Sequence, residues 1–428
     1  TYDWRDGIGP REKRPRRASW WYYQDGRIEK NQVGTHEFNH FCRLVGAEPY
    51  LAANMTSVPA LHIRDWIEYC NFKAGLTTLS DERAANGDVE PFRVKYWGIG
   101  NENWGGGGQM TPEMCADEYI RFTTIMRSLD TTDLKFIICG ANGHDLAWTR
   151  RLMKEWASRR RHETPTWGIS LHYYTNAFGP FDDLAYHNEE DWYDELFRAN
   201  YMARIIDDHR AALDEADPER KIKLVIDEWG NWHKGGTGPS KGYNLFEQQS
   251  NMRDAIVAAM TLNIVNNRCD VVGMANVAQL CNNLHSLYLA GGDQFVETPN
   301  YYVFDMFRGH KGGKQLKTVV SAKTVEHRKY EEMSTLSASA SVQDGTLTLT
   351  VANLDVTAAK EVSISGLGGR ISGQGTLRLL THKDPNTCNT FEEPYAVVPA
   401  ETAVALQDGD TIFLPAASIA SLSLRLAE

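Results

Sequence analysis

The chain has 428 residues, 42% of them hydrophobic and 24% charged, and a formal net charge of −11 at pH 7. Because one hydrophobic core rarely serves so long a chain, we expect two domains. The negative charge argues against a nucleic acid as the main partner, since such a ligand requires a basic face. No apolar run reaches the roughly 20 residues that span a bilayer, so we also expect no membrane partner.

One basic cluster lies near the N-terminus. Pro10 and Pro15 interrupt it, and the rest of the chain is acidic, so we expect a solvated loop rather than a nucleic-acid site. The members of the cluster are Arg11, Lys13, Arg14, Arg16 and Arg17.

Residues 36–40 read His-Glu-Phe-Asn-His and match the HExxH zinc signature. In that signature two histidines one helical turn apart bind zinc and the glutamate activates water, so a zinc peptidase is an alternative function. On a helical wheel, however, the apolar stripe places His36 and His40 on the solvent side, and Thr35 as N-cap puts His36 at the first helical position. We therefore expect the match to be accidental, with no metal ligands here. The stripe consists of Phe38, Phe41, Cys42 and Val45.

Between residues 48 and 279 short apolar runs alternate with amphipathic helical stretches, which indicates βα units and a parallel sheet. Thr111 and Pro112 form a helix start, with an N-cap and a proline at the first helical position. A helical stripe farther on is expected to face the sheet; it contains Met252, Ala255, Ile256, Ala259 and Met260. The six predicted strands cover residues 49–54, 96–102, 135–141, 168–174, 223–228 and 271–279.

From residue 313 the apolar pattern changes to a two-residue alternation, with Asp-Gly and Gly-Gly turns between the runs. This pattern predicts an antiparallel β-sandwich over residues 313–428, after a catalytic domain over residues 1–312. The alternating residues include Leu347, Leu349, Val351, Leu377, Leu379, Leu422, Leu424 and Leu426.

The seven cysteines include no CxxC pair. Cys70, Cys115 and Cys139 fall in apolar patterns, so we expect buried free thiols and a reducing, cytoplasmic compartment, with a periplasmic or secreted location as the alternative. The glycosylation sequon at Asn54 lies at a strand end, where a glycan would block the pocket, and we interpret it as a chance match.

Two glutamates, Glu102 and Glu228, close otherwise apolar predicted strands. Parallel α/β folds place catalytic groups at these strand ends, where side chains converge on one mouth. Cleavage of a glycoside with retention needs two carboxyl groups about 5 to 5.5 Å apart, one protonated to donate to the leaving oxygen and one ionised to attack. Either glutamate alone would suit a helix cap or an ion pair, but the two together predict a glycosidase that requires no metal and no cofactor.

Four motifs then resemble glycoside hydrolase family 51, the α-L-arabinofuranosidases. They are Trp-Gly-Ile-Gly-Asn-Glu-Asn-Trp at 97–104, Ser-Leu-His-Tyr-Tyr at 170–174, Asp-Glu-Trp-Gly-Asn-Trp at 227–232 and Ala-Asn-Val-Ala-Gln at 275–279. The resemblance extends through residues 4–10, 31–35, 48–50 and 389–394. It implies a (β/α)8 TIM-type barrel followed by the sandwich, and release of terminal α-L-arabinofuranosyl groups from polysaccharides or oligosaccharides by double displacement.

The same resemblance implies residue roles. Glu102 is expected to be the acid/base and Glu228 the nucleophile, and Asn101 is expected to bind the sugar 2-hydroxyl. His172 and Tyr174 should orient Glu228. Trp232 should line the leaving-group side, and Gln279 should contact the sugar.

The six predicted strands match strands 3 to 8 of such a barrel, so we expect its first two strands to lie upstream or on a separate chain or fragment. Strand 3 would then expose an unpaired edge, and the polypeptide alone would be poorly stable. Gly106 stands where relatives often carry cysteine. The resemblance also suggests a homo-oligomer.

Two other activities and one non-catalytic function remain open. The resemblance also covers some endoglucanases and xylosidases. Pocket depth would separate the exo-acting from the endo-acting enzymes, because an exo-acting enzyme needs a closed end and an endo-acting one needs an open cleft. A non-catalytic carbohydrate-binding protein would bind sugar without turnover.

Overall fold

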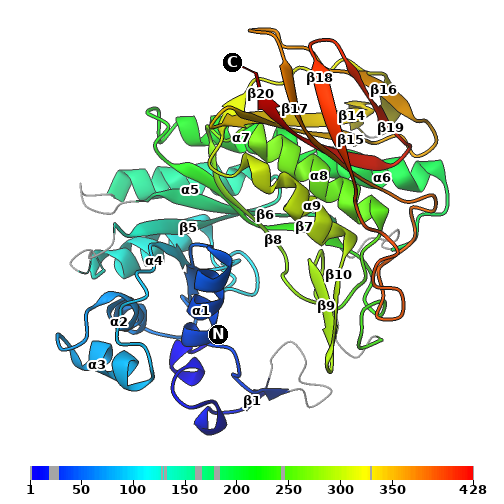
Figure 1. Cartoon of the computed structure of the whole chain (residues 1–428). Helices are drawn as coiled ribbons and strands as arrows, with labels where there is room; N and C mark the ends of the chain where they lie inside the picture. The colour runs from blue at the N-terminus through cyan, green and yellow to red at the C-terminus, as the bar shows by residue number, and fades with distance from the viewer. Residues whose placement is uncertain are drawn as a thin grey trace. The chain divides into compact units, whose positions relative to one another are not determined.

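The computed structural model describes residues 2–18, 28–126, 129, 133–159, 166–177, 184–241, 246–327 and 330–427 (Figure 1). The chain forms two compact units. One contains residues 1–171 and 209–225, and the other contains residues 172–208 and 226–428. Among the described helices, none is both long and apolar enough to span a membrane.

A six-stranded sheet carries the predicted βα region, with its strands side by side in chain order. Tyr50 lies opposite Tyr96, and Tyr96 lies opposite Lys135, in parallel register. All six predicted strands are confirmed, and consecutive parallel strands joined by helices are part of the wall of a (β/α)8 barrel. The strands are β3 (Tyr50–Ala53), β4 (Tyr96–Ile99), β5 (Lys135–Asn142), β6 (Gly168–Ala177), β7 (Lys223–Trp232) and β8 (Val272–Val277).

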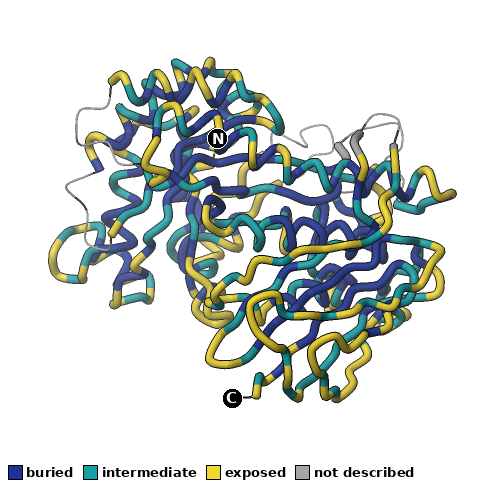
Figure 2. Tube along the Cα trace, turned by 90° about the horizontal axis from the view of Figure 1, so that it is seen from above, coloured by how far each residue is buried: buried dark blue, intermediate teal, exposed yellow. Residues whose placement is uncertain are grey.

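Helices follow most of these strands. The hydroxyl of Thr111 accepts a hydrogen bond from the amide of Met114 at 3.2 Å, which confirms the predicted helix start. Figure 2 shows the buried residues in dark blue mainly in the interior and the exposed residues in yellow mainly at the periphery. The helices are α1 (Thr35–Val45), α2 (Ala60–Asn71), α3 (Thr78–Ala85), α4 (Pro112–Thr124), α5 (Leu146–Arg159), α6 (Glu189–Asn200), α7 (Met202–Asp214), α8 (Met252–Asn266) and α9 (Pro299–Phe307), with 3-10 turns η1 (Trp4–Gly7), η2 (Arg11–Lys13) and η5 (Arg308–His310).

Helix α8 is buried on more than the predicted stripe. Every residue from 252 to 261 is buried, including Arg253 and Asp254. The second face of the helix contacts the sandwich, where Asn263 donates to the Ser337 hydroxyl at 3.2 Å. The predicted stripe therefore accounts for only part of the burial of this helix.

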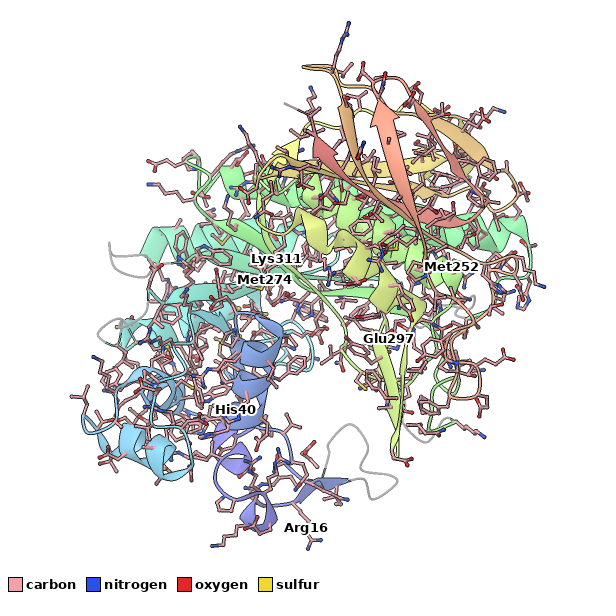
Figure 3. All side chains as sticks on the ribbon, viewed as in Figure 1. Arg16, His40, Met252, Met274, Glu297 and Lys311 are labelled. Carbon is pink, nitrogen blue, oxygen red and sulfur yellow. The ribbon has the colours of Figure 1, made fainter. Side chains whose placement is uncertain are left out.

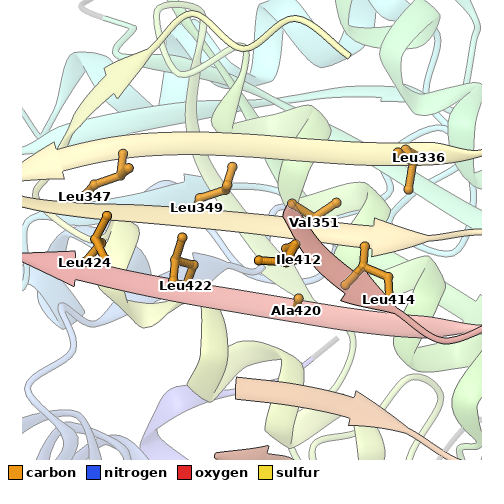
Figure 4. Packing of buried hydrophobic residues seen from close by; sticks show 9 residues of the cluster. All are labelled: Leu336, Leu347, Leu349, Val351, Ile412, Leu414, Ala420, Leu422 and Leu424. Atoms are coloured by element: carbon orange, nitrogen blue, oxygen red, sulfur yellow. The ribbon is translucent and has the colours of Figure 1, made fainter. Parts of the chain in front are cut away.

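The C-terminal region is the predicted β-sandwich. A six-stranded antiparallel sheet has the order β11-β14-β15-β20-β17-β18, and β16 pairs with β19. Figure 4 shows the core between them, where Leu347 lies opposite Leu424 and Leu349 opposite Leu422. The domain boundary at 312/313 stays a prediction. The strands are β11 (Lys314–Leu316), β12 (Thr324–His327), β13 (Tyr330–Ser334), β14 (Leu336–Gln343), β15 (Thr346–Asn353), β16 (Lys360–Ser363), β17 (Ser372–Thr381), β18 (Ala400–Gln407), β19 (Thr411–Leu414) and β20 (Ser418–Leu426), besides the short hairpins β1 (Arg17–Ala18) with β2 (Ile28–Glu29) and β9 (Tyr288–Gly291) with β10 (Gln294–Glu297).

All seven cysteines lie in described segments and are free thiols. The three that were predicted to be buried, Cys70, Cys115 and Cys139, are buried. Burial raises the pKa of the Cys70 thiol, which keeps it in its protonated, unreactive form.

The N-terminal basic cluster differs from the predicted solvated loop. Arg16 is exposed and lies at the periphery of the chain (Figure 3), as expected. Arg14, in contrast, is buried and donates to the carbonyl of Asn31 at 2.8 Å and to the carboxylate of Glu37 at 2.9 Å. The prediction is wrong for Arg14 because a sequence-distant carboxylate neutralises its charge.

Candidate active site

Glu102 lies in a tight loop three residues after the end of β4, rather than on the strand as predicted. Its φ of 46° falls in the left-handed region, which non-glycine residues adopt rarely and which is common at functional sites. The amides of Gly105 and Gly107 donate to the Glu102 carbonyl at 2.8 and 3.0 Å. The backbone of the loop therefore fixes the position from which the Glu102 side chain extends.

The glycines of this loop have different freedom. A Cβ atom at Gly107 would overlap the carbonyl oxygen of Asn101, whereas one at Gly105 would meet only the Glu102 carbonyl oxygen at 3.8 Å. Position 107 therefore requires glycine. The loop is also connected to β5, because the amide of Asn103 donates to the sulfur of Cys139 at 3.3 Å.

A hollow of about 190 Å³ opens beside Asn101. Asn54 lies in its wall and is already engaged, since its side-chain oxygen accepts from the amide of Thr56 at 2.9 Å and its nitrogen donates to the Tyr2 carbonyl at 3.0 Å. Aromatic rings and amide side chains together suit a sugar, whose faces are apolar and whose edges are polar. The lining residues are Tyr2, Trp4, Ala52, Ala53, Asn54, His62, Ile63, Trp66 and Asn101.

Glu228 lies on β7 and is held by side chains from β6. The Tyr174 hydroxyl donates to Glu228 Oε2 at 2.6 Å, and His172 Nδ1 lies 3.4 Å from the same oxygen. His172 is buried, and its Nε2 lies 3.3 Å from Asp227 Oδ1. Hydrogen bonding to a charged acceptor stabilises the ionised form, so this environment suits a carboxylate that acts as a nucleophile.

Trp232 stands on the same face of β7 as Glu228, because side chains alternate along a strand and these positions differ by four. Its ring centroid lies 5.0 Å from that of Tyr174 in an edge-to-face arrangement, and 5.1 Å from that of Phe246. The ring remains half-buried, so one face can contact a ligand.

Gln279 is exposed just after β8, and the Ala278–Gln279 peptide is cis. Its side-chain oxygen accepts from Asn283 at 3.2 Å. The predicted site residues that the structure brings together are His172, Tyr174, Glu228 and Trp232. The predicted sugar contacts of Asn101 and Gln279 stay predictions, as do the catalytic roles of the two glutamates.

Comparison with known proteins decides the family. The family model described as Alpha-L-arabinofuranosidase 1 domain matches residues 1–200, and the one described as Alpha-L-arabinofuranosidase C-terminal domain matches residues 227–418. The crystal structure of the GH51 arabinofuranosidase from Xanthomonas axonopodis pv. citri is 33% identical, has a TM-score of 0.88, and aligns over 99% of this chain and 84% of that one. The chain belongs to glycoside hydrolase family 51.

Two further relatives support this family 51 assignment. A Bacteroides ovatus protein named intracellular exo-α-L-arabinofuranosidase is 35% identical, over 99% of this chain and 81% of its own length. The Thermotoga maritima α-L-arabinofuranosidase, solved as an arabinose complex, is 27% identical with a TM-score of 0.82, over 100% of this chain and 85% of that one. The likeness to these structures confirms the expected TIM-type barrel and C-terminal sandwich.

Sequence reasoning missed a buried polar network behind β7 of this family 51 chain. Asn231 donates to Glu195 Oε1 on α6 and to Asp254 Oδ1 on α8, both at 2.6 Å. His233 Nε2 lies 2.7 Å from the same Asp254 oxygen, and Arg253 pairs with Glu195 at 2.8 Å. The available signal was the Arg-Asp pair inside the apolar sequence of α8, since buried charges require partners.

Glu195, His233 and Asp254 offer ligand atoms within 4.8 Å of one another, a spacing that a metal ion could bridge. However, both carboxylates already accept from Asn231, and Arg253 supplies a positive charge beside Glu195. Burial favours a neutral His233, but the carboxylates of Asp254 and Glu195 act against burial, and the pKa of the ring is raised. The network is therefore balanced by its own charges.

The HExxH motif does not have the expected geometry. His36 is buried rather than solvent-facing, with Nδ1 2.6 Å from Asp88, and His40 lies 2.8 Å from the same carboxylate. Burial alone would raise the pKa of Glu37, but hydrogen bonds, first of all from Arg14, lower it to about 2. Glu37 thus serves an ion pair instead of activating water, which argues against a zinc peptidase.

The predicted apolar stripe of α1 is also wrong. Cys42 is buried as expected, but Phe41 and Val45 are 40% and 57% exposed. Thr35 is the first helical residue, and Gly34 takes the N-cap position. The helix instead buries the side of His36 and Asn39, because these two polar side chains find hydrogen-bond partners.

Proposed function

We propose that this chain is a retaining exo-α-L-arabinofuranosidase that removes terminal arabinofuranosyl groups from arabinose-containing glycans. The observation that carries the proposal is the hydrogen-bonded environment of Glu228, whose Oε2 accepts from Tyr174 at 2.6 Å and lies 3.4 Å from His172 Nδ1. The names of the Bacteroides ovatus and Thermotoga maritima relatives support arabinofuranose as the sugar that is removed.

Glu228 and Glu102 take the two roles of the reaction. Glu228 attacks the anomeric carbon while Glu102 donates a proton to the departing glycosidic oxygen, which gives a covalent arabinosyl ester. Glu102, now ionised, then removes a proton from water, and the water displaces Glu228 with net retention. Glu102 follows β4 and Glu228 lies on β7, and parallel α/β folds place catalytic groups at such strand ends, which supports these two roles.

Three other residues take supporting roles. Asn101, which lines the hollow before Glu102, binds the sugar 2-hydroxyl, and Gln279 contacts the same sugar. Trp232 lines the leaving-group side with its half-buried ring. We infer an intracellular, homo-oligomeric enzyme; the name of the Bacteroides ovatus relative supports the compartment.

A panel of aryl glycosides tests the substrate class. We expect turnover of the α-L-arabinofuranoside at a kcat/KM at least about tenfold above that of the xyloside and the glucoside, since a missing or mismatched hydroxyl leaves buried polar groups unpaired. A preferred xyloside or glucoside would favour the xylosidase or endoglucanase alternatives. Saturable sugar binding without turnover of any of the three would favour the carbohydrate-binding alternative.

A further inference from the structure

We propose that Asn231 is a positioning residue that fixes Trp232, and through Trp232 sets how well the enzyme accepts a sugar as leaving group. The inference rests on the proposed function, because it specifies the leaving-group side of the same site. Asn231 itself lies behind the strand and is fully buried.

The direction of the side chains separates the two faces of β7. Glu228 and Trp232 are half-buried, whereas Trp229, Asn231 and His233 are buried at 2% exposure or less. This alternation is that of a strand with one face on the pocket and the other on the surrounding helices. Asn231 therefore acts on its neighbour through the backbone and does not touch the sugar.

The Asn231 side chain connects β7 to two helices at once. Its amide nitrogen donates to Glu195 on α6 and to Asp254 on α8, both at 2.6 Å. Both acceptors are carboxylates at 4% exposure or less, and hydrogen bonds with charged groups are short and strong in such surroundings. These two bonds fix the strand against its outer layer at this position.

The backbone on both sides of Trp232 is held as well. The Asn231 amide donates to His285 Nδ1 at 2.8 Å, and the His233 amide donates to Gln248 Oε1 at 2.9 Å. Burial lowers the pKa of His285 to about 4, so its ring is neutral near pH 7 and Nδ1 can accept. Trp232 is thus a half-buried side chain between two anchored residues.

Trp232 also packs against two other aromatic rings. Tyr174 and Phe246 contact it edge-to-face at centroid distances of 5.0 and 5.1 Å. A shift of about 1 Å in the position of such a ring can lower the rate about 100-fold when the ring must stack on a substrate. The position of Trp232 is therefore a means of selecting leaving groups.

The test compares Asn231→Ala with Asn263→Ala. Asn263 is a matched control, because it is also buried and its Oδ1 accepts from Ser339 and Thr350 at 2.7 Å, on the sandwich side of α8. We expect Asn231→Ala to lower kcat/KM for an arabino-oligosaccharide about 10- to 100-fold, and that for an aryl arabinofuranoside with a good leaving group less than about fivefold. Asn263→Ala should leave the ratio of the two values unchanged.

A double-mutant cycle with Trp232→Ala shows whether the effect passes through the ring. If it does, Asn231→Ala adds less than about twofold in the Trp232→Ala background, since residues that act through one another are not additive. Independent, multiplicative effects would overturn the inference, as would equal changes of the substrate ratio in the Asn231 and Asn263 variants. Asn231→Ser, which keeps one donor, replaces the alanine variant if that variant does not fold.

Hydrogen exchange of the peptide covering residues 226–234 gives a readout that does not need turnover. We expect faster exchange there in Asn231→Ala and unchanged exchange in Asn263→Ala, because only the former loses the side-chain hydrogen bonds that hold β7 to α6 and α8. Unchanged exchange in both variants would overturn the inference. A wild-type protein that cleaves no arabinofuranoside would instead overturn the proposed function, and the exchange result would still decide whether Asn231 anchors the strand.

Discussion

The two candidate catalytic glutamates are held in different ways. Glu102 lies on a glycine-rich loop, where the amides of Gly105 and Gly107 donate to the Glu102 carbonyl and the residue has a φ of 46°. Glu228 lies on a regular strand, and its side chain is oriented by other side chains, above all by the Tyr174 hydroxyl at 2.6 Å. One position therefore depends on the absence of a side chain at Gly107, and the other on the presence of a hydroxyl on the neighbouring strand.

This difference matches the chemistry that we propose. A nucleophile must present one ionised oxygen in a fixed direction, and hydrogen bonds from Tyr174 and contact with His172 provide that direction. An acid/base residue serves two successive steps and needs a fixed location more than a fixed charge. We therefore expect Glu102 to be sensitive to substitutions that add a side chain to its loop, and Glu228 to be sensitive to substitutions that remove the neighbouring hydroxyl.

The largest effect should come from Glu228→Ala. Removal of a nucleophile lowers kcat on the order of 10⁴-fold or more, because no other group forms the covalent intermediate. The assay is kcat on an aryl arabinofuranoside, with Glu361→Ala, an exposed glutamate of β16, as the control that should retain full activity. A Glu228→Ala enzyme within tenfold of wild type would refute the nucleophile assignment.

The next effect tests the loop. Gly107→Ala should lower kcat/KM by about 100-fold, because the added Cβ would overlap the Asn101 carbonyl and displace Glu102. Gly105→Ala is the control, since its Cβ would meet only a carbonyl oxygen at 3.8 Å. Both variants should keep the wild-type circular dichroism spectrum. Equal activities of the two variants would mean that the loop does not set the position of Glu102.

Tyr174→Phe should lower kcat by about 10- to 100-fold, the value expected for one hydrogen bond to a charged group. Tyr173→Phe is a matched control on the same strand, because its hydroxyl donates to the Arg198 carbonyl at 2.8 Å instead of to a carboxylate. If Tyr173→Phe is as impaired as Tyr174→Phe, general disturbance of β6, and not orientation of Glu228, is the cause.

The smallest effect concerns stability away from both glutamates. Burial lowers the pKa of His310 to about 4, against about 6.5 in the unfolded chain. The unfolded chain therefore binds a proton that the folded chain does not, and the free energy of unfolding falls as the pH drops from about 6.5 to 4. We expect this histidine to account for about 2 kcal/mol of that loss.

Urea unfolding at pH 7 and at pH 4.5 measures the contribution of His310. The His310→Gln variant should lose less stability between the two pH values than wild type, and its activity at pH 7 should be unchanged. An identical pH dependence in the two proteins would show that the ring is protonated equally in the folded and unfolded states.

Local patterns predicted the strands well. The apolar run at residues 135–141 predicts β5 to within one residue, and the run at 223–228 predicts the first part of β7, which continues to Trp232. Buried strands of a parallel sheet have continuous apolar runs, which makes them recognisable in the sequence. The alternation through Leu347 and Leu349 likewise located the sandwich core. Glu228 could be singled out because it closes such an apolar run.

Features that depend on distant partners were not predictable from one segment. His36 and Arg14 are buried because Asp88 and Glu37 compensate them, and neither partner can be inferred from the local sequence. Asn231 joins residues from two different helices. Its role becomes visible only once the fold has brought α6 and α8 to the same strand.

Trapping of the covalent intermediate tests the central claim most directly. In the Glu102→Ala variant, an aryl arabinofuranoside with a good leaving group needs no proton donor, so the first step stays fast while the second lacks its base. We predict that mass spectrometry of the peptides will find one pentosyl group esterified to Glu228. An adduct on another carboxylate, or unmodified enzyme during slow turnover, would contradict the account.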